Sequence, residues 1–139
     1  MSNLFNLFNT SASALTAQSV RLNTVASNLA NANTVSGSAE EAYRAKQVLF
    51  QTVMNQADPS GGASPVRVAG ITESNAPPQT HYEPNHPQAN EDGYVFRPAI
   101  SVVEEMANMM SASRNYEANV EVMETSRQLL QRTLQIGQG

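Results

Sequence analysis

The feature that most constrains this chain is its C-terminal segment, because residues 99–139 contain no proline. Ser101 and Glu104 have the spacing of a capping box, in which each side chain satisfies a backbone N–H of the first helical turn. A helix from Ser101 to Ile136 is roughly 54 Å long at 1.5 Å per residue. Its side chains recur in steps of four and three, as in a coiled-coil seam: Val102, Met106, Met109, Ser113, Tyr116, Val120, Met123, Arg127, Leu130 and Leu134. Such a helix needs a partner helix to cover this seam.

The N-terminal segment offers that partner. The same spacing recurs at Leu4, Phe8, Ser11, Leu15, Gln18, Leu22, Val25, Leu29 and Ala32. The segment ends in the turn residues Asn33, Ser36 and Gly37. In residues 1–39 the only charged side chain is Arg21, and 19 of the 39 residues are Ser, Thr, Asn or Gln. These uncharged faces favour packing against close neighbours on several sides, since a helix surface that faces water usually carries more charge.

The middle of the chain has the pattern of short strands. Apolar runs occur in residues 43–53, in residues 66–71, around Tyr82 and in residues 94–96, the last after the turn pair Asp92-Gly93. The fold class predicted is mainly α, with long N- and C-terminal helices paired as a coiled coil and a small β-rich middle subdomain. We expect an N-terminal helix in residues 1–36, a middle subdomain of β-hairpins and loops in 37–99, and a C-terminal helix in 100–139.

Composition excludes several classes of protein. The net charge is −4, and Ser, Thr, Asn and Gln total 47 residues against 20 charged ones. With Lys46 as the single lysine and no basic stripe, we expect no nucleic-acid partner. The absence of cysteine excludes disulfide scaffolds, thiolate metal sites and cysteine nucleophiles. No run of about 18 apolar residues is present, and nothing before Arg21 has the pattern of a secretory signal. We expect no direct membrane insertion.

One group of side chains could suggest a metal site: His81, Glu83, His86 and Asp92. The prolines at 84 and 87 break any helix that would align these ligands, so a surface loop is the better interpretation. The sequence contains no phosphate-binding glycine loop and no ordered Ser-His-Asp pattern. We therefore predict a protein that is not an enzyme, with no catalytic residues, no metal and no cofactor.

Two features of the C-terminal helix leave alternatives open. Methionines at helical spacing are typical either of a simple core or of an adaptable binding groove, and both place them in a helix interface: Met106, Met109, Met110 and Met123. Arg127 at a seam position could lay its stem along the interface with the guanidinium at the edge. Alternatively, it could form a buried ion pair that sets the helix register.

Specific motifs add a resemblance to a known family. The stretch SALTAQSVRLN from Ser13 to Asn23, continued by VASNLANANT from Val25 to Thr34, resembles the N-terminal signature of bacterial flagellar rod and hook axial proteins. Further segments resemble the proximal rod proteins of that family: YRAK at 43–46, YEP at 82–84, HP at 86–87, GYV at 93–95, EEM at 104–106 and SASRNYEANV at 111–120. Residues 97–100, Arg-Pro-Ala-Ile, depart from the Pro-Asn pair expected before the long helix.

The resemblance implies a structural subunit of the flagellar proximal rod, the drive shaft that crosses the periplasm. Such a subunit is exported without a cleaved signal peptide by the flagellar type III apparatus. Its partners are itself, other proximal and distal rod proteins, the rod-junction protein and the MS-ring. In that family the terminal helices line the export channel as an inner tube and carry the torque.

We expect the assembly interface to combine seam and signature residues of both helices: Leu15, Leu22, Val25, Asn28, Leu29, Asn31, Met106, Met109, Arg114, Tyr116, Asn119, Val120, Met123, Leu130 and Leu134. The alternative function is a soluble coiled-coil adaptor that binds one client helix. Concentration-dependent sedimentation separates the two, because a tube subunit forms open-ended polymers whereas an adaptor stops at a closed oligomer.

Overall fold

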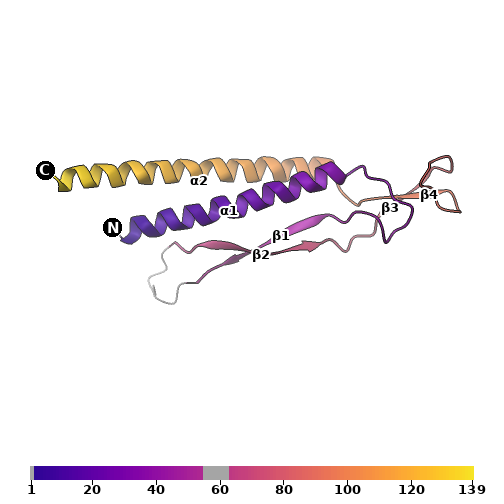
Figure 1. The fold of residues 1–139 in the computed structure, drawn as a ribbon, viewed down its shortest axis with the longest axis horizontal. Coiled ribbons are helices and arrows are strands. Elements are labelled where there is room, and N and C mark those ends of the chain that lie inside the picture. Colours follow the sequence, from indigo (N-terminus) through magenta and orange to yellow (C-terminus); the bar gives the residue numbers. More distant parts are fainter. Residues whose placement is uncertain (1, 55–62) are drawn as a thin grey trace.

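The structure is a computed structural model that describes residues 2–54 and 63–139. Two long helices flank a middle region with two small antiparallel sheets, as the sequence predicts (Figure 1). The elements in chain order are α1 (Ser2–Asn31), β1 (Lys46–Thr52), β2 (Val66–Glu73), β3 (Gln79–Tyr82), β4 (Tyr94–Arg97) and α2 (Val102–Gly137).

The two helices run antiparallel and side by side, so both chain ends lie at the same end of the molecule (Figure 1). The start of α2 is as predicted, because Ser101 is its N-cap in an extended conformation and its hydroxyl accepts the Glu104 N–H at 3.4 Å. Glu104 and Glu105 place negative charge in the first turn, where the helix dipole favours it. The helix therefore starts where its local sequence specifies.

α1 lies between α2 and the β1–β2 hairpin, which runs along α1 on the side away from α2 (Figure 1). In the hairpin Lys46 pairs with Glu73 at one end and Thr52 pairs with Val66 at the other, with a bulge between Leu49 and Phe50. Both strands fall on the predicted apolar runs. α1, in which Arg21 is the one charged side chain, thus has neighbours on two sides within its own chain.

The second hairpin, β3–β4, lies beyond the other end of the helices (Figure 1). Ser36 forms a bridge with Phe96, which ties the segment after α1 to β4. Gly93, just before β4, has φ of +82°, and its N–H donates to the Asn90 carbonyl at 2.9 Å. This predicted turn residue ends a long connection between β3 and β4 rather than forming a two-residue hairpin turn.

The interior is built from small and neutral polar side chains instead of large apolar ones. The residues that are buried include the apolar Ala17, Val25, Ala32, Ala42, Val95 and Ala112, and the polar Ser11, Thr24, Asn28 and Ser126. Small residues let helix backbones approach closely, and each buried polar group then needs a hydrogen-bond partner. The surplus of Ser, Thr and Asn in the sequence is thus partly used inside the protein, at buried positions such as Thr24 and Asn28.

The register of α2 against α1 differs from the one predicted. The residues most deeply buried on α2 are Ala112 and Ser126, whereas Met106 and Val120 are 55% and 45% exposed. Successive residues of a helix are turned by about 100°. Several of the predicted seam positions therefore lie to one side of the contact with α1 rather than at its centre. The prediction of a buried seam is wrong at the positions that are exposed: Val102, Met106, Tyr116, Val120, Arg127 and Leu134. Of these, Val120 and Arg127 still line a groove with Phe8 and Leu15 of α1. Small residues therefore occupy the most buried positions of α2, as they do on α1 at Ser11 and Ala17.

Candidate assembly surface

On α1 the predicted interface residues fall where the spacing places them. Leu15, Leu22 and Leu29 are half-buried, and Val25 is 5% exposed. Asn31 is half-buried, but its Nδ2 donates to the Ser27 carbonyl of the preceding turn at 2.9 Å. These leucines therefore already contribute to packing within the chain, and Asn31 caps its own helix end.

Asn28 is the centre of a buried polar junction, and its side chain is 1% exposed. Its Oδ1 accepts the Lys46 backbone N–H at 2.9 Å and the Tyr43 hydroxyl at 3.0 Å. Its Nδ2 donates to the Lys46 carbonyl at 2.9 Å and to Glu105 Oε2 at 3.1 Å. An amide offers two donors and two acceptor positions, so every hydrogen-bonding site of Asn28 is in use. One side chain thereby joins α1, the start of β1 and the start of α2.

Two further contacts surround this junction. The Ser27 and Tyr43 hydroxyls lie 3.1 Å apart, and Arg21 Nη2 donates to Asn108 Oδ1 at 3.4 Å between α1 and α2. Tyr43 also lies under the Lys46 ammonium, whose nitrogen is 5.9 Å from the ring centroid. The junction combines uncharged and charged side chains from three segments that are distant in sequence.

On α2 the predicted interface residues divide into two groups. Met109, Asn119, Met123 and Leu130 are half-buried along the contact with α1. The others are exposed in this chain: Met106, Arg114, Tyr116, Val120 and Leu134. The second group is free to contact a neighbouring molecule, and its membership of an assembly interface remains a prediction.

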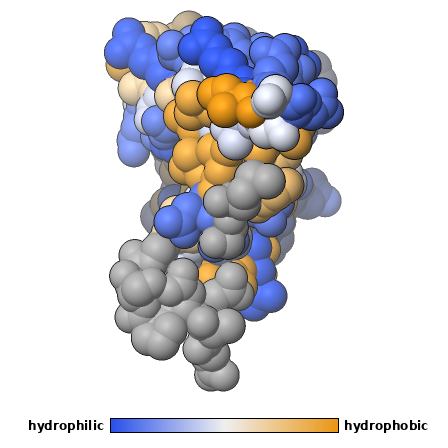
Figure 2. All heavy atoms as spheres, turned by 90° about the vertical axis from the view of Figure 1, so that its left-hand side faces the viewer, coloured by the Kyte–Doolittle hydropathy of each residue, from blue (hydrophilic) through white to orange (hydrophobic). Residues whose placement is uncertain are grey.

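Exposed apolar side chains are numerous on α2. Val103, Met110, Leu129 and Ile136 are 78%, 58%, 48% and 80% exposed. These side chains are spread from one end of α2 to the other, so they leave apolar surface available for contacts along the length of the helix. α1 adds Phe5, which is 54% exposed near the end where both termini lie. Figure 2, which views the molecule from that end, shows hydrophobic residues gathered below a hydrophilic rim.

The open alternatives on α2 are partly decided. Arg127 forms an exposed ion pair with Glu124 at 3.2 Å on the same helix, which excludes a buried pair between helices. Its stem lines a shallow groove together with Phe8, Leu15 and Met123. Among the methionines, Met109 and Met123 are half-buried and Met106 and Met110 are exposed, so the stripe is not simple core.

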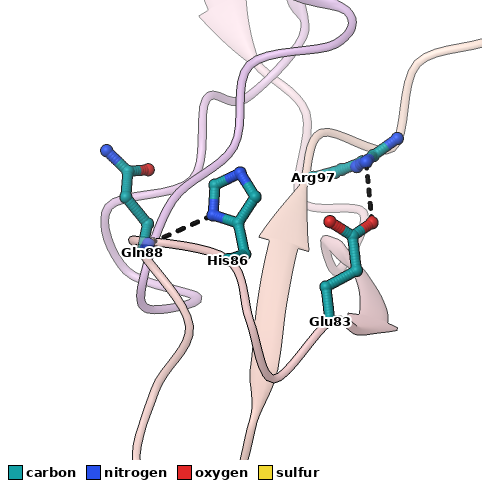
Figure 3. A network of polar contacts seen from close by, with 4 residues as sticks. All are labelled: Glu83, His86, Gln88 and Arg97. Carbon is teal, nitrogen blue, oxygen red and sulfur yellow. Dashed lines mark hydrogen bonds and ion pairs between the residues drawn. The ribbon is translucent and has the colours of Figure 1, made fainter.

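Two of the side chains considered for metal binding, Glu83 and His86, make other contacts. Glu83 Oε1 pairs with Arg97 Nη2 at 2.9 Å, and His86 Nδ1 accepts the Gln88 N–H at 3.1 Å (Figure 3). His81 lies in β3 and is exposed. In residues 2–54 and 63–139 no three side chains of the metal-binding types come together. The pair from Glu83 to Arg97 instead links the connection after β3 to β4.

Sequence reasoning did not assign roles to Tyr43, Lys46 or Glu105. All three bind Asn28, across 15, 18 and 77 residues of sequence respectively. The available signal was an asparagine adjacent to the predicted helix seam, because a polar side chain placed to be buried must find partners. That signal marks Asn28 as a junction but does not name the residues that meet it.

Comparison with known proteins places the chain in a family. A family model described as flagella basal body rod protein matches residues 8–37, and one described as flagellar basal body rod FlgEFG protein C-terminal matches residues 91–136. The flagellar basal-body rod protein FlgC of Escherichia coli O157:H7 is 51% identical over 97% of this chain and 98% of its own length. The chain belongs to the FlgC family of flagellar basal-body rod proteins.

More distant members of the FlgC family match over the same length. The Salmonella typhimurium LT2 protein is 50% identical, over 97% of this chain and 98% of its own length. The Bacillus subtilis 168 protein is 39% identical, over 96% of this chain and 97% of its own length. As a member of this family the chain is a structural subunit of the flagellar basal-body rod. Over the described residues neither helix is apolar enough to cross a bilayer.

Proposed function

We propose that the chain is a non-enzymatic subunit of the proximal rod that polymerises through its terminal helices into a tube around the export channel. The observation that supports this best is the set of large apolar residues that α2 leaves exposed after it has packed on α1, including Met106 at 55% and Val103 at 78%. Burial of apolar area between neighbouring helices drives association, at about 25 cal/mol per Å². Interdigitated side chains then resist shear collectively, which suits a shaft that transmits torque.

Its partners in this proposal are further copies, the other proximal and distal rod proteins, the rod-junction protein and the MS-ring. The chain reaches the periplasm through the flagellar type III export apparatus, without cleavage. The neutral Ser, Thr and Asn side chains of α1 support a position near a wet channel, since they tolerate either water or close packing without a strong charge.

Substitution of Met106 by aspartate tests the proposal. Met106→Asp places a charge on a face that is exposed in the monomer, so the monomer stays folded, but desolvation of that charge disfavours assembly. We expect normal circular dichroism of the purified protein, loss of the variant from isolated basal bodies, and loss of swimming. Asn85→Asp, at an exposed position in the connection between β3 and β4 and outside both terminal helices, is the control and should enter basal bodies normally. Basal bodies with a normal content of the Met106→Asp protein, from cells that swim normally, would contradict the proposal.

A further inference from the structure

The β1–β2 hairpin is attached to α1 by polar side chains at both of its ends. At one end Asn28 binds both the N–H and the carbonyl of Lys46, each at 2.9 Å. At the other end Ser13 Oγ accepts the Val66 N–H at 3.0 Å and donates to the Thr10 carbonyl at 2.7 Å.

The geometry at Lys46 is that of a strand pairing with a strand. A backbone neighbour in a sheet exchanges one N–H and one carbonyl with its partner residue, and the Asn28 amide supplies the same acceptor and donor from a helix. The remaining donor of Asn28 binds Glu105 of α2, and its remaining acceptor position binds the Tyr43 hydroxyl. Loss of the amide would therefore leave the backbone N–H and carbonyl of the half-buried Lys46 without these partners.

The two attachment points fit only one placement of the hairpin. Along α1 the distance from Ser13 to Asn28 is about 22 Å at 1.5 Å per residue. Along the hairpin the distance from Lys46 to Thr52, which pairs with Val66, is about 20 Å at 3.3 Å per residue. Because these lengths agree within a few ångströms, both contacts form together only when the hairpin lies along α1 in the observed register.

We propose that Asn28 is a positioning residue. Its amide makes the two hydrogen bonds that a neighbouring strand would make with Lys46, and it thereby fixes the start of the β1–β2 hairpin against both terminal helices. This role concerns how a single chain holds its own hairpin, so it goes beyond the proposed assembly and can be tested without it.

The composition of the chain provides a specific assay. Lys46 is the only lysine, so a lysine-specific endoprotease can cut the chain at one bond, after the residue whose carbonyl Asn28 holds. Cleavage requires this bond to open locally. In the purified full-length chain, we expect Asn28→Asp to accelerate cleavage about tenfold or more, because a carboxylate cannot donate to Lys46 or Glu105 and repels the latter. Asn23→Asp, at an exposed position of α1, is the matched control and leaves the rate unchanged.

A second substitution distinguishes a specific contact from general damage. Glu105→Gln supplies a donor for the new carboxylate, so it should slow the cleavage of the Asn28→Asp protein at least threefold, an estimate for one regained hydrogen bond. An arginine-specific endoprotease serves as a second probe, with only cleavage after Arg114, in the middle of α2, being measured. This bond should be cut at the wild-type rate in the Asn28→Asp protein and in the protein that also carries Glu105→Gln. Equal cleavage after Lys46 in Asn28→Asp and Asn23→Asp, no slowing by Glu105→Gln, or a parallel increase after Arg114 would each overturn the proposal. Since the assay uses the free chain, failure of the chain to enter rods would leave its result unchanged.

Discussion

The contact between the two helices can be tested at Ala112, which is fully buried on α2. Replacement of Ala112 by leucine adds three carbon atoms at a position of α2 that is already fully buried. Overpacking of a close-packed interior typically costs about 1–3 kcal/mol. Ser111 is the adjacent residue and is exposed, so Ser111→Leu adds a similar side chain with an expected change within about 0.5 kcal/mol.

Urea unfolding followed by circular dichroism measures this difference. With a dependence of about 2 kcal/mol per molar urea for a small protein, the midpoint for Ala112→Leu should fall by roughly 0.5–1.5 M. The midpoint for Ser111→Leu should stay at the wild-type value or rise slightly, because leucine is the better helix former. If the two variants unfold at the same urea concentration, the register of α2 on α1 described above is wrong.

Two further predictions concern the β3–β4 hairpin. Gly93→Ala should destabilise it by about 2 kcal/mol or more, because φ is +82° and the new Cβ would lie 2.9 Å from the Tyr82 ring; the change should appear as faster hydrogen exchange of the Glu83 N–H, which donates to the Gly93 carbonyl. Glu83→Gln should lower the unfolding free energy by only about 0.5 kcal/mol, because the partly exposed pair with Arg97 is screened by water. Thermal unfolding should show that difference at low salt and not at 1 M salt, and a difference that persists at 1 M would contradict an ionic origin.

Much of the fold could be predicted because its signals are local. Pro98 and Ser101 specify where α2 begins, and the apolar runs locate the strands within a few residues. The surplus of neutral polar residues near the N-terminus predicted a helix with neighbours on several sides, and α1 does lie between α2 and the hairpin. The seam of α1 was also predicted, since each of its positions from Leu4 to Ala32 is at least half-buried.

The contact face of α2 was only half predicted, and the reason is physical. Large apolar residues at four-three spacing indicate a seam when every such side chain is buried, but Met106 and Val120 remain exposed here. The most deeply buried positions of α2 are instead the small residues Ala112 and Ser126. The spacing of residues within one helix does not determine which of them become buried, because that depends on the shape of the partner helix.

The sequence by itself determined two helices, their approximate ends, the strands between them and the membership of a rod protein family. The tertiary structure alone decided the register of the helices, the placement of the hairpin and the partners of Asn28. Helix and strand formation depend on residues a few positions apart, so they can be predicted from a single stretch of sequence. The hydrogen bonds from Asn28 to Lys46 and Glu105 join groups 18 and 77 residues apart, and only the folded chain brings these groups within 3.1 Å.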